Sequence, residues 1–158
     1  MKLREFTLND AERVAYLVGD KAVSEWTVNI PYPYDRSDAK EWIERTASSD
    51  ERCPFAIELN GAVVGCVSFW PHGKEAVEVG YWVGKEYWGQ GIATQALKML
   101  MSKSTFPAVP EVVAKAMKEN IGSKRVLSKC GFKLKKECLI PKLGSQIEGC
   151  LYILSSEA

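Results

Sequence analysis

The chain has 158 residues and a mass of 17.6 kDa, the size of one ordinary domain and too short for two that each bury a full core. Hydrophobic residues make up 46% and charged residues 26%, which excludes a disordered chain, a collagen-like repeat and a coiled-coil rod. The formal net charge is +1, so no overall positive excess exists to hold a nucleic acid or an anionic membrane. We expect a single domain over residues 1–158.

The sequence predicts no membrane-spanning or export segment. Its longest apolar stretch, Ala62–Trp70, is far shorter than the about 20 residues that span a bilayer, and Met1–Phe6 mixes charged and apolar residues, unlike a secretory signal. The cysteines are odd in number and form no Cys-x-x-Cys pair, which argues against a disulfide framework and a zinc site. They are Cys53, Cys66, Cys130, Cys138 and Cys150. We expect a cytoplasmic protein that binds no metal.

The first third of the chain predicts a short strand followed by helices. Lys2–Thr7 alternates as a strand, Asn9-Asp10 offers a helix N-cap, and helical character continues through Lys21–Trp26. The run Pro31-Tyr32-Pro33-Tyr34 breaks regular structure, because each proline fixes its own backbone and biases its predecessor to an extended conformation. Ser37-Asp38 is then expected to cap a second helix that runs to Ala47.

The rest of the chain predicts a sheet interrupted by helices. Asn60-Gly61 predicts a tight hairpin turn, because both central residues of that turn need a positive φ. From Ile92 the apolar period changes from strand to helix, and a further helix is predicted over Gly122–Cys130. The predicted strands are Cys53–Leu59, Ala62–Trp70, Glu75–Gly84, Glu111–Met117, Phe132–Ile140 and Gly149–Leu154. This order indicates a mixed α/β domain around a largely antiparallel sheet.

The most informative stretch is the turn Gly84–Thr94, between a predicted strand and the helix that follows it. Gly89 and Gly91 remove side chains where the chain enters the helix, so backbone N–H groups and the helix dipole can face a phosphate. The spacing fits neither a P-loop nor Gly-x-Gly-x-x-Gly, because position 94 is Thr. The alternative is that the two glycines only permit a tight turn.

These residues resemble the GNAT superfamily of acyl-CoA-dependent N-acyltransferases over nearly the whole chain. The signature Gln/Arg-x-x-Gly-x-Gly/Ala matches Trp88–Ala93, except that Trp88 replaces the leading Gln/Arg. Glu78–Gly84, Asn120–Ser123 and Lys129–Phe132 resemble the subgroup of bacterial acetyltransferases of ribosomal-protein N-termini, the RimJ/RimL-like enzymes. The resemblance implies an α+β fold with six to seven mostly antiparallel strands and about four helices, and acetyl-CoA as the acetyl donor.

By this resemblance, main-chain groups hold acetyl-CoA. Tyr81, Trp82 and Val83 pair with its pantetheine arm like an added strand, and the amides at the helix entry bind its pyrophosphate. Asn120 contacts the cofactor or orients a water, or is only a turn or cap residue. The cofactor-binding residues implied at the helix entry are Trp88, Gly89, Gln90, Gly91, Ile92, Ala93 and Thr94.

Glu78 is the candidate general base. The period of two along Glu75–Gly84 places it on a weakly polar face, and an amine with a pKa of about 8 to 10 must lose a proton before it attacks a thioester. The family position of Glu78 adds to this interpretation. The alternative is an exposed strand carboxylate that is paired with a lysine.

Ser123 is the candidate partner of the leaving thiolate. Many superfamily members use a tyrosine seven residues after the motif asparagine, and this sequence has Leu127 there. Ser123 takes the place of the serine in the ribosomal-protein subgroup, and it can equally be a helix cap. A covalent mechanism through Cys130 has little support, because the single histidine, His72, is interpreted as a solvated loop residue.

The leading hypothesis is acetyl transfer to a primary amine by direct attack, with a protein or peptide N-terminal α-amine as acceptor. The aromatic side chains of Trp26, Tyr32 and Trp70 are candidates to line the acceptor groove. The alternatives are a small amine (polyamine, amino acid or aminoglycoside) as acceptor, and a non-catalytic acyl-CoA-binding module. We expect a monomer or homodimer with no nucleic-acid partner, and read the lysine cluster at 133–136 as a solvated strand face.

Overall fold

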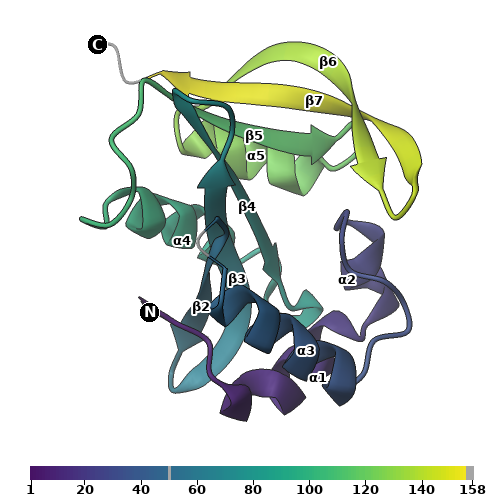
Figure 1. Ribbon diagram of the computed structural model, residues 1–158. Coiled ribbons are helices and arrows are strands. Elements are labelled where there is room, and N and C mark those ends of the chain that lie inside the picture. The colour runs from purple at the N-terminus through teal and green to yellow at the C-terminus, as the bar shows by residue number, and fades with distance from the viewer. Residues whose placement is uncertain (50, 156–158) are drawn as a thin grey trace.

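The computed structural model describes residues 1–49 and 51–155 and contains one seven-stranded sheet (Figure 1). The strand order is β1-β2-β3-β4-β5-β7-β6, and all neighbours are antiparallel except β4 and β5. The strands are β1 (Lys2–Arg4), β2 (Cys53–Leu59), β3 (Ala62–Pro71), β4 (Ala76–Val83), β5 (Glu111–Met117), β6 (Lys133–Lys142) and β7 (Ser145–Ser155). The mixed, mostly antiparallel sheet predicted from the sequence is confirmed.

Helices cover both faces of this sheet. Those in the described chain are η1 (Leu8–Asp10), α1 (Ala11–Val18), α2 (Lys21–Glu25), α3 (Arg36–Ala47), η2 (Lys85–Tyr87), α4 (Ile92–Met101) and α5 (Ile121–Lys129). Helix α2 is separate from α1, because the Asp20 side chain caps it by accepting a hydrogen bond from the Ala22 N–H at 2.9 Å.

Two predicted element boundaries, the start of α3 and the end of β1, are wrong by a few residues. Helix α3 is capped by Asp35 and not by Ser37-Asp38: Asp35 accepts from the Asp38 N–H at 3.0 Å, and Asp38 accepts in return from the Asp35 N–H at 2.9 Å. Strand β1 ends at Arg4 and not at Thr7. Asp10 is the N-cap residue of α1, within the predicted pair, but its carboxylate accepts from the Arg4 guanidinium at 2.9 and 3.0 Å and from no backbone N–H of α1.

Two hairpin turns use residues with positive φ. Asn60 and Gly61 have φ of 52° and 84° between β2 and β3, which confirms the predicted turn. Leu143 and Gly144 have φ of 46° and 88° between β6 and β7. The sequence did not indicate this second turn, because a leucine seldom adopts a left-handed backbone. The strands flanking it are therefore longer than predicted.

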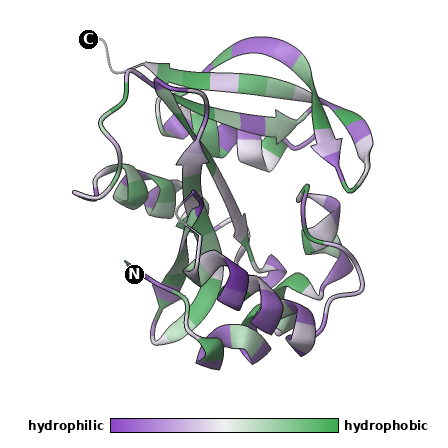
Figure 2. Ribbon diagram, in the orientation of Figure 1, coloured by the Kyte–Doolittle hydropathy of each residue, from purple (hydrophilic) through white to green (hydrophobic). Residues whose placement is uncertain are grey.

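The main hydrophobic core lies between the sheet and α4 and α5. Its fully buried side chains include Ile57, Leu97, Leu100 and Leu127, each worth about 1.5–3 kcal/mol of transfer free energy. A second cluster joins α1, α2 and α3 to the opposite face of the sheet. In Figure 2 hydrophobic residues colour much of β2, β3 and α4, and hydrophilic residues much of α3.

None of the described helices is long and apolar enough to cross a membrane. Over residues 1–49 and 51–155, no group of three or more His, Cys, Asp or Glu side chains is placed to hold a metal ion. All five cysteines carry free thiols, and two of them, Cys66 and Cys150, are buried.

Candidate active site

Strand β4 has two faces that meet different parts of the molecule. Val79 and Val83 are buried in the core that contains α4 and α5, whereas Trp82 packs against the α1 and α3 cluster. Glu78 and Gly80 share the face of Trp82, because alternate residues of a strand point the same way. The strand therefore separates two surfaces, one on each side of the sheet.

Strands β4 and β5 are paired only at their N-terminal ends. Their parallel pairing ends at Val79–Ala114, and no pairing beyond it links these two fully described strands. In an antiparallel pair, the backbone N–H and C=O groups of alternate residues point toward the partner strand and away from it. Those of Tyr81 and Val83 point away from β3 and toward the opening. The last residues of β4 thus form an open edge inside the sheet, suited to pairing with an extended ligand.

The glycine-rich turn lies at the end of this opening and leads into α4. Gly89 and Gly91 have φ of 76° and 75°, and Gly91 is the N-cap of the helix. A Cβ atom built on either glycine meets no protein atom within 4 Å. Helix N-termini carry free N–H groups and a positive partial charge, so this space fits a phosphate. The predicted cradle fits the pyrophosphate of acetyl-CoA.

Trp88, the residue that departs from the family signature, fixes the turn to β4. Its indole N–H donates a hydrogen bond of 2.7 Å to the carbonyl of Val83, while its ring remains 43% exposed. Gln90 also holds the turn, through a 3.4 Å hydrogen bond to the Glu86 carbonyl. Trp88 thus stabilises the turn, and its hydrogen bond uses one carbonyl group of the open edge.

Ser123 and Tyr81 form a hydroxyl pair at the N-terminus of α5. Asn120 is the N-cap of this helix and accepts from the Ser123 N–H at 3.1 Å, so Ser123 is not the cap. The Ser123 Oγ lies 2.7 Å from the Tyr81 hydroxyl. Burial raises the pKa of Tyr81, against the smaller opposite effect of Ser123, which keeps the phenol protonated at neutral pH. Leu127, at the usual tyrosine position, is fully buried.

Glu78 lies on the other face of β4, beside a histidine and a lysine. Its side chain is 13% exposed, and its Oε1 is 3.3 Å from His72 Nδ1 and 3.8 Å from Lys115 Nζ. His72 is an exposed loop residue, as predicted, and its ring also faces this carboxylate. The backbone N–H of His72 donates to the Ala76 carbonyl at 3.0 Å, which fixes the loop that carries it.

Trp70 and Arg52 continue the row of side chains on this face. Trp70 is directly opposite Glu78 in the β3–β4 register. Its ring lies over Gly80, since a Cβ built there would be 2.8 Å from the indole Cη2 atom. The Arg52 guanidinium stacks on the indole, with Cζ 4.0 Å from the ring centroid. We call Glu78, Trp70 and Arg52 the acceptor row.

The other predicted candidates lie apart from this row. Trp26 and Tyr32 are 42% and 55% exposed in the segment between α2 and α3. Lys142 of β6 holds the end of α2 beside Trp26, with its ammonium 2.6 Å from the Glu25 carbonyl. The Cys130 thiol donates to the Thr94 carbonyl at 3.6 Å, and burial raises its pKa, which disfavours a nucleophilic thiolate.

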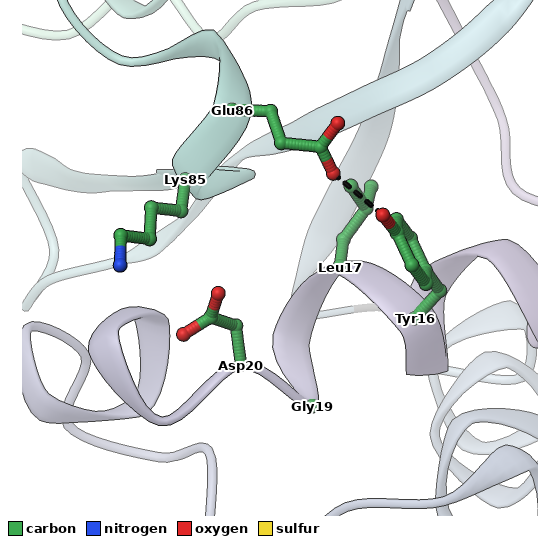
Figure 3. Close-up of a pocket in the computed structure, with 6 residues that line it drawn as sticks. All are labelled: Tyr16, Leu17, Gly19, Asp20, Lys85 and Glu86. Atoms are coloured by element: carbon green, nitrogen blue, oxygen red, sulfur yellow. Dashed lines mark hydrogen bonds between the residues drawn. The ribbon is translucent and has the colours of Figure 1, made fainter.

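A small hollow of about 290 Å³ lies between the end of α1 and η2 (Figure 3). The residues that line it are Tyr16, Leu17, Gly19, Asp20, Lys85 and Glu86. The Tyr16 hydroxyl closes one side by a 2.7 Å hydrogen bond to Glu86. None of the acceptor row lines this hollow.

Comparison with protein families matches residues 1–133 to the family described as the acetyltransferase (GNAT) domain. The chain belongs to the GNAT acetyltransferase family. The matched range contains Glu78, the glycine-rich turn and the Tyr81–Ser123 pair. The protein is thus a GNAT domain, with N-acetylation from acetyl-CoA as its activity. No curated protein matches the chain significantly.

Solved structures with the same fold share little sequence with this GNAT domain. The microcin C7 self-immunity acetyltransferase MccE, solved with acetyl-CoA and AMP, is 22% identical with a TM-score of 0.84, over 97% of this chain and 91% of that one. Mycobacterium smegmatis RimJ, solved as a complex with CoA-disulfide, is 24% identical with a TM-score of 0.83, over 98% and 81%. RimL, a ribosomal L7/L12 α-N-protein acetyltransferase solved with CoA, is 18% identical with a TM-score of 0.81, over 97% and 92%.

Sequence reasoning missed three features of this site. It selected Tyr81 for its backbone and not for its hydroxyl, and it did not select Arg52 or Lys115. The predicted hairpin did not place Arg52 beside Trp70: a regular ladder from the Leu59–Ala62 pair puts Arg52 opposite Phe69, and the register shift between Ile57 and Glu58 moves it opposite Trp70. Lys115 depends on the parallel β4–β5 register, which no short-range pattern specifies.

Proposed function

We propose that this GNAT domain transfers the acetyl group of acetyl-CoA to a primary amine by direct attack, with Glu78 as the general base. The observation that carries the proposal is the position of Glu78, a mostly buried carboxylate on the same strand as the open edge at Tyr81–Val83. A carboxylate there can take a proton from an ammonium group, directly or through a water, next to a donor bound along that edge.

The donor supplies an activated thioester, and main-chain groups of the protein hold and orient it. The backbone of Tyr81 and Val83 pairs with its extended arm, and the amides that begin α4 hold its pyrophosphate. A donor held by main-chain groups has little freedom to shift, so its carbonyl carbon is kept in one position for attack.

Ser123 stabilises the departing thiolate. Its hydroxyl can donate a hydrogen bond to the sulfur while it accepts one from Tyr81. The raised pKa of Tyr81 suits this role, because the phenol remains a donor throughout the neutral range. The linked hydroxyls of Ser123 and Tyr81 thus take the role of the single tyrosine that many superfamily members have at the position of Leu127.

A protein or peptide N-terminal α-amine is the leading acceptor. RimJ and RimL are among the structures that share the fold, and the latter is described as acting on a ribosomal-protein α-amine. An α-amino group has a pKa of about 8, lower than that of a lysine side chain at about 10, so its ammonium form gives up a proton to a carboxylate base more readily at neutral pH.

A small amine is the second candidate acceptor. The Arg52 guanidinium beside the base, which has no ion-pair partner among the described residues, favours it, since a free amino acid carries an anionic group close to its amine. An N-terminal α-amine of a neutral peptide carries no such group.

Mass spectrometry of transfer from isotope-labelled acetyl-CoA tests the proposal. The acceptors are peptides with Ser, Ala and Met N-termini, polyamines, amino acids and aminoglycosides, each assayed with the wild type and Glu78→Gln. Label on peptide α-amines that depends on Glu78 supports the leading acceptor, and label on a small amine assigns the second. Absence of label on every acceptor, with acetyl-CoA binding intact, contradicts the proposal in favour of a binding module.

A further inference from the structure

Arg52 is a charged side chain that the transfer mechanism does not use. It directly precedes β2, is half-buried, and stacks on the Trp70 ring. Within residues 1–49 and 51–155, its guanidinium makes no ion pair and no side-chain hydrogen bond, whereas Arg4 pairs with both Asp10 and Glu58. The indole covers its planar surface, but none of its five N–H donors has a protein acceptor in the part of the chain that the structure describes.

The register of the sheet puts this free cation near the proposed base. Trp70 is opposite Glu78, and Arg52 precedes by one residue the Cys53–Phe69 pair of the β2–β3 ladder. Two strand spacings, about 10 Å, separate the backbones of Arg52 and Glu78, and the Arg52 side chain leans over Trp70 between them. The two charges are close enough to interact but form no ion pair with each other.

Among the described residues, no carboxylate forms an ion pair with Arg52. Glu78 is contacted instead by His72 Nδ1 at 3.3 Å and by Lys115 Nζ at 3.8 Å. Burial lowers the pKa of Arg52, as expected for a charge removed from water without a partner. An anionic ligand group here can form a charge-assisted hydrogen bond with a guanidinium that is already oriented by the indole.

We propose that Arg52 binds an anionic group of the acceptor, so that the preferred substrate is an amine with a carboxylate or similar anion a few bonds from its nitrogen. The acceptor row then binds both charged groups of a zwitterion: Glu78 binds the ammonium, Trp70 contacts the carbon skeleton, and Arg52 binds the anion. This inference rests on the proposed acetyl transfer. It narrows the acceptor to a free amino acid or to a peptide with an acidic side chain at its N-terminus.

Matched acceptor pairs test the inference by kinetics. Free amino acids are compared with their amides, one pair for each side-chain class, and a peptide beginning with Asp is compared with one beginning with Asn. We expect the wild type to prefer the anionic member of at least one pair type by about tenfold in kcat/KM, the effect of one charge-assisted contact. Preference among free acids identifies the α-carboxylate as the anion, and preference for the Asp peptide identifies the side chain.

Variants separate recognition of the anion from a packing role of Arg52. Arg52→Gln should reduce the preference to about one, chiefly by lowering kcat/KM for the anionic member. Arg36→Gln, an exposed arginine on α3, is the matched control and should retain the preference. Equal rates for the acid and the amide in the wild type, or a preference that survives in Arg52→Gln, would overturn the inference.

A binding measurement separates failure of this inference from failure of the proposed transfer. N-acetylleucine and N-acetylleucinamide are titrated into CoA-saturated protein, and the indole N–H resonance of Trp70 is followed by NMR after assignment with Trp70→Phe. A saturable shift with the acid alone, absent in Arg52→Gln, supports anion binding even where no turnover is detected. Identical responses to both compounds contradict it.

Discussion

The open edge of β4 and the face that carries Glu78 differ in what they offer to a substrate. The edge at the β4–β5 opening presents main chain: the N–H and C=O groups of Tyr81 and Val83, with the amides after Gly91 beyond them. The Glu78 face presents side chains, with Glu78 flanked by His72 and Lys115 and continued by Trp70 and Arg52. The proposed donor binding requires only a backbone conformation, whereas the proposed acceptor binding depends on individual side chains.

The sharpest test of this difference is Glu78→Gln. The substitution keeps the size of the side chain but removes the base, so we expect kcat to fall by about 10²–10⁴ while the Kd for acetyl-CoA is unchanged. Steady-state kinetics between pH 6 and 9 measure the loss. Glu75→Gln, an exposed residue at the start of the same hairpin arm, is the control and should retain full activity. Full activity of Glu78→Gln across this range would exclude Glu78 as the base.

Gly91→Val tests the donor side. Its φ of 75° strains any other residue by about 1–2 kcal/mol, and the new side chain enters the space proposed for the pyrophosphate. We expect the Kd for acetyl-CoA to rise at least about tenfold, as loss of a phosphate contact does.

Gly61→Val is the matched control for backbone strain. Gly61 has a φ of 84° and equally open surroundings, but it lies in the β2–β3 turn. Calorimetric titration and thermal unfolding of both variants separate lost binding from lost stability. A folded Gly91→Val protein that binds acetyl-CoA like the wild type would eliminate the cradle.

The hydroxyl pair gives a smaller effect. Ser123→Ala and Tyr81→Phe should each lower kcat by about tenfold, because each removes one link of the donor chain to the thiolate. The double variant should lose little more than either single one, since the two hydroxyls act together. Ser128→Ala, on the exposed side of α5, controls for helix effects. Independent, multiplying losses would show that the pair does not act as a unit.

Gly80→Ala should give the mildest change, confined to the acceptor side. The added methyl group displaces the Trp70 ring, which lies 2.8 Å from the site of the new atom, and should raise the KM for the amine severalfold with unchanged acetyl-CoA affinity. Combining it with Trp70→Phe makes room again and should recover part of the loss. An unchanged KM in Gly80→Ala would remove Trp70 from the acceptor surface.

The same contrast explains how much could be predicted from the sequence. The glycine-rich turn, Asn60-Gly61 and the strand periodicity are local signals, and they located the sheet and the turn that we propose binds the donor. Glu78 was selected by alternation and family position. The partners of Glu78 come from different elements, His72 from a loop, Lys115 from β5 and Arg52 from the start of β2, and only tertiary register brings them together. Local patterns do not contain that register.

Titration of acetyl-CoA into purified Glu78→Gln tests most directly whether the open edge of β4 and its Glu78 face have separate roles. We expect the variant to bind acetyl-CoA with the Kd of the wild type, although it no longer transfers the acetyl group. A large loss of acetyl-CoA affinity in a folded Glu78→Gln protein would show that Glu78 belongs to the donor side, and would contradict a division between main-chain donor binding and side-chain acceptor chemistry.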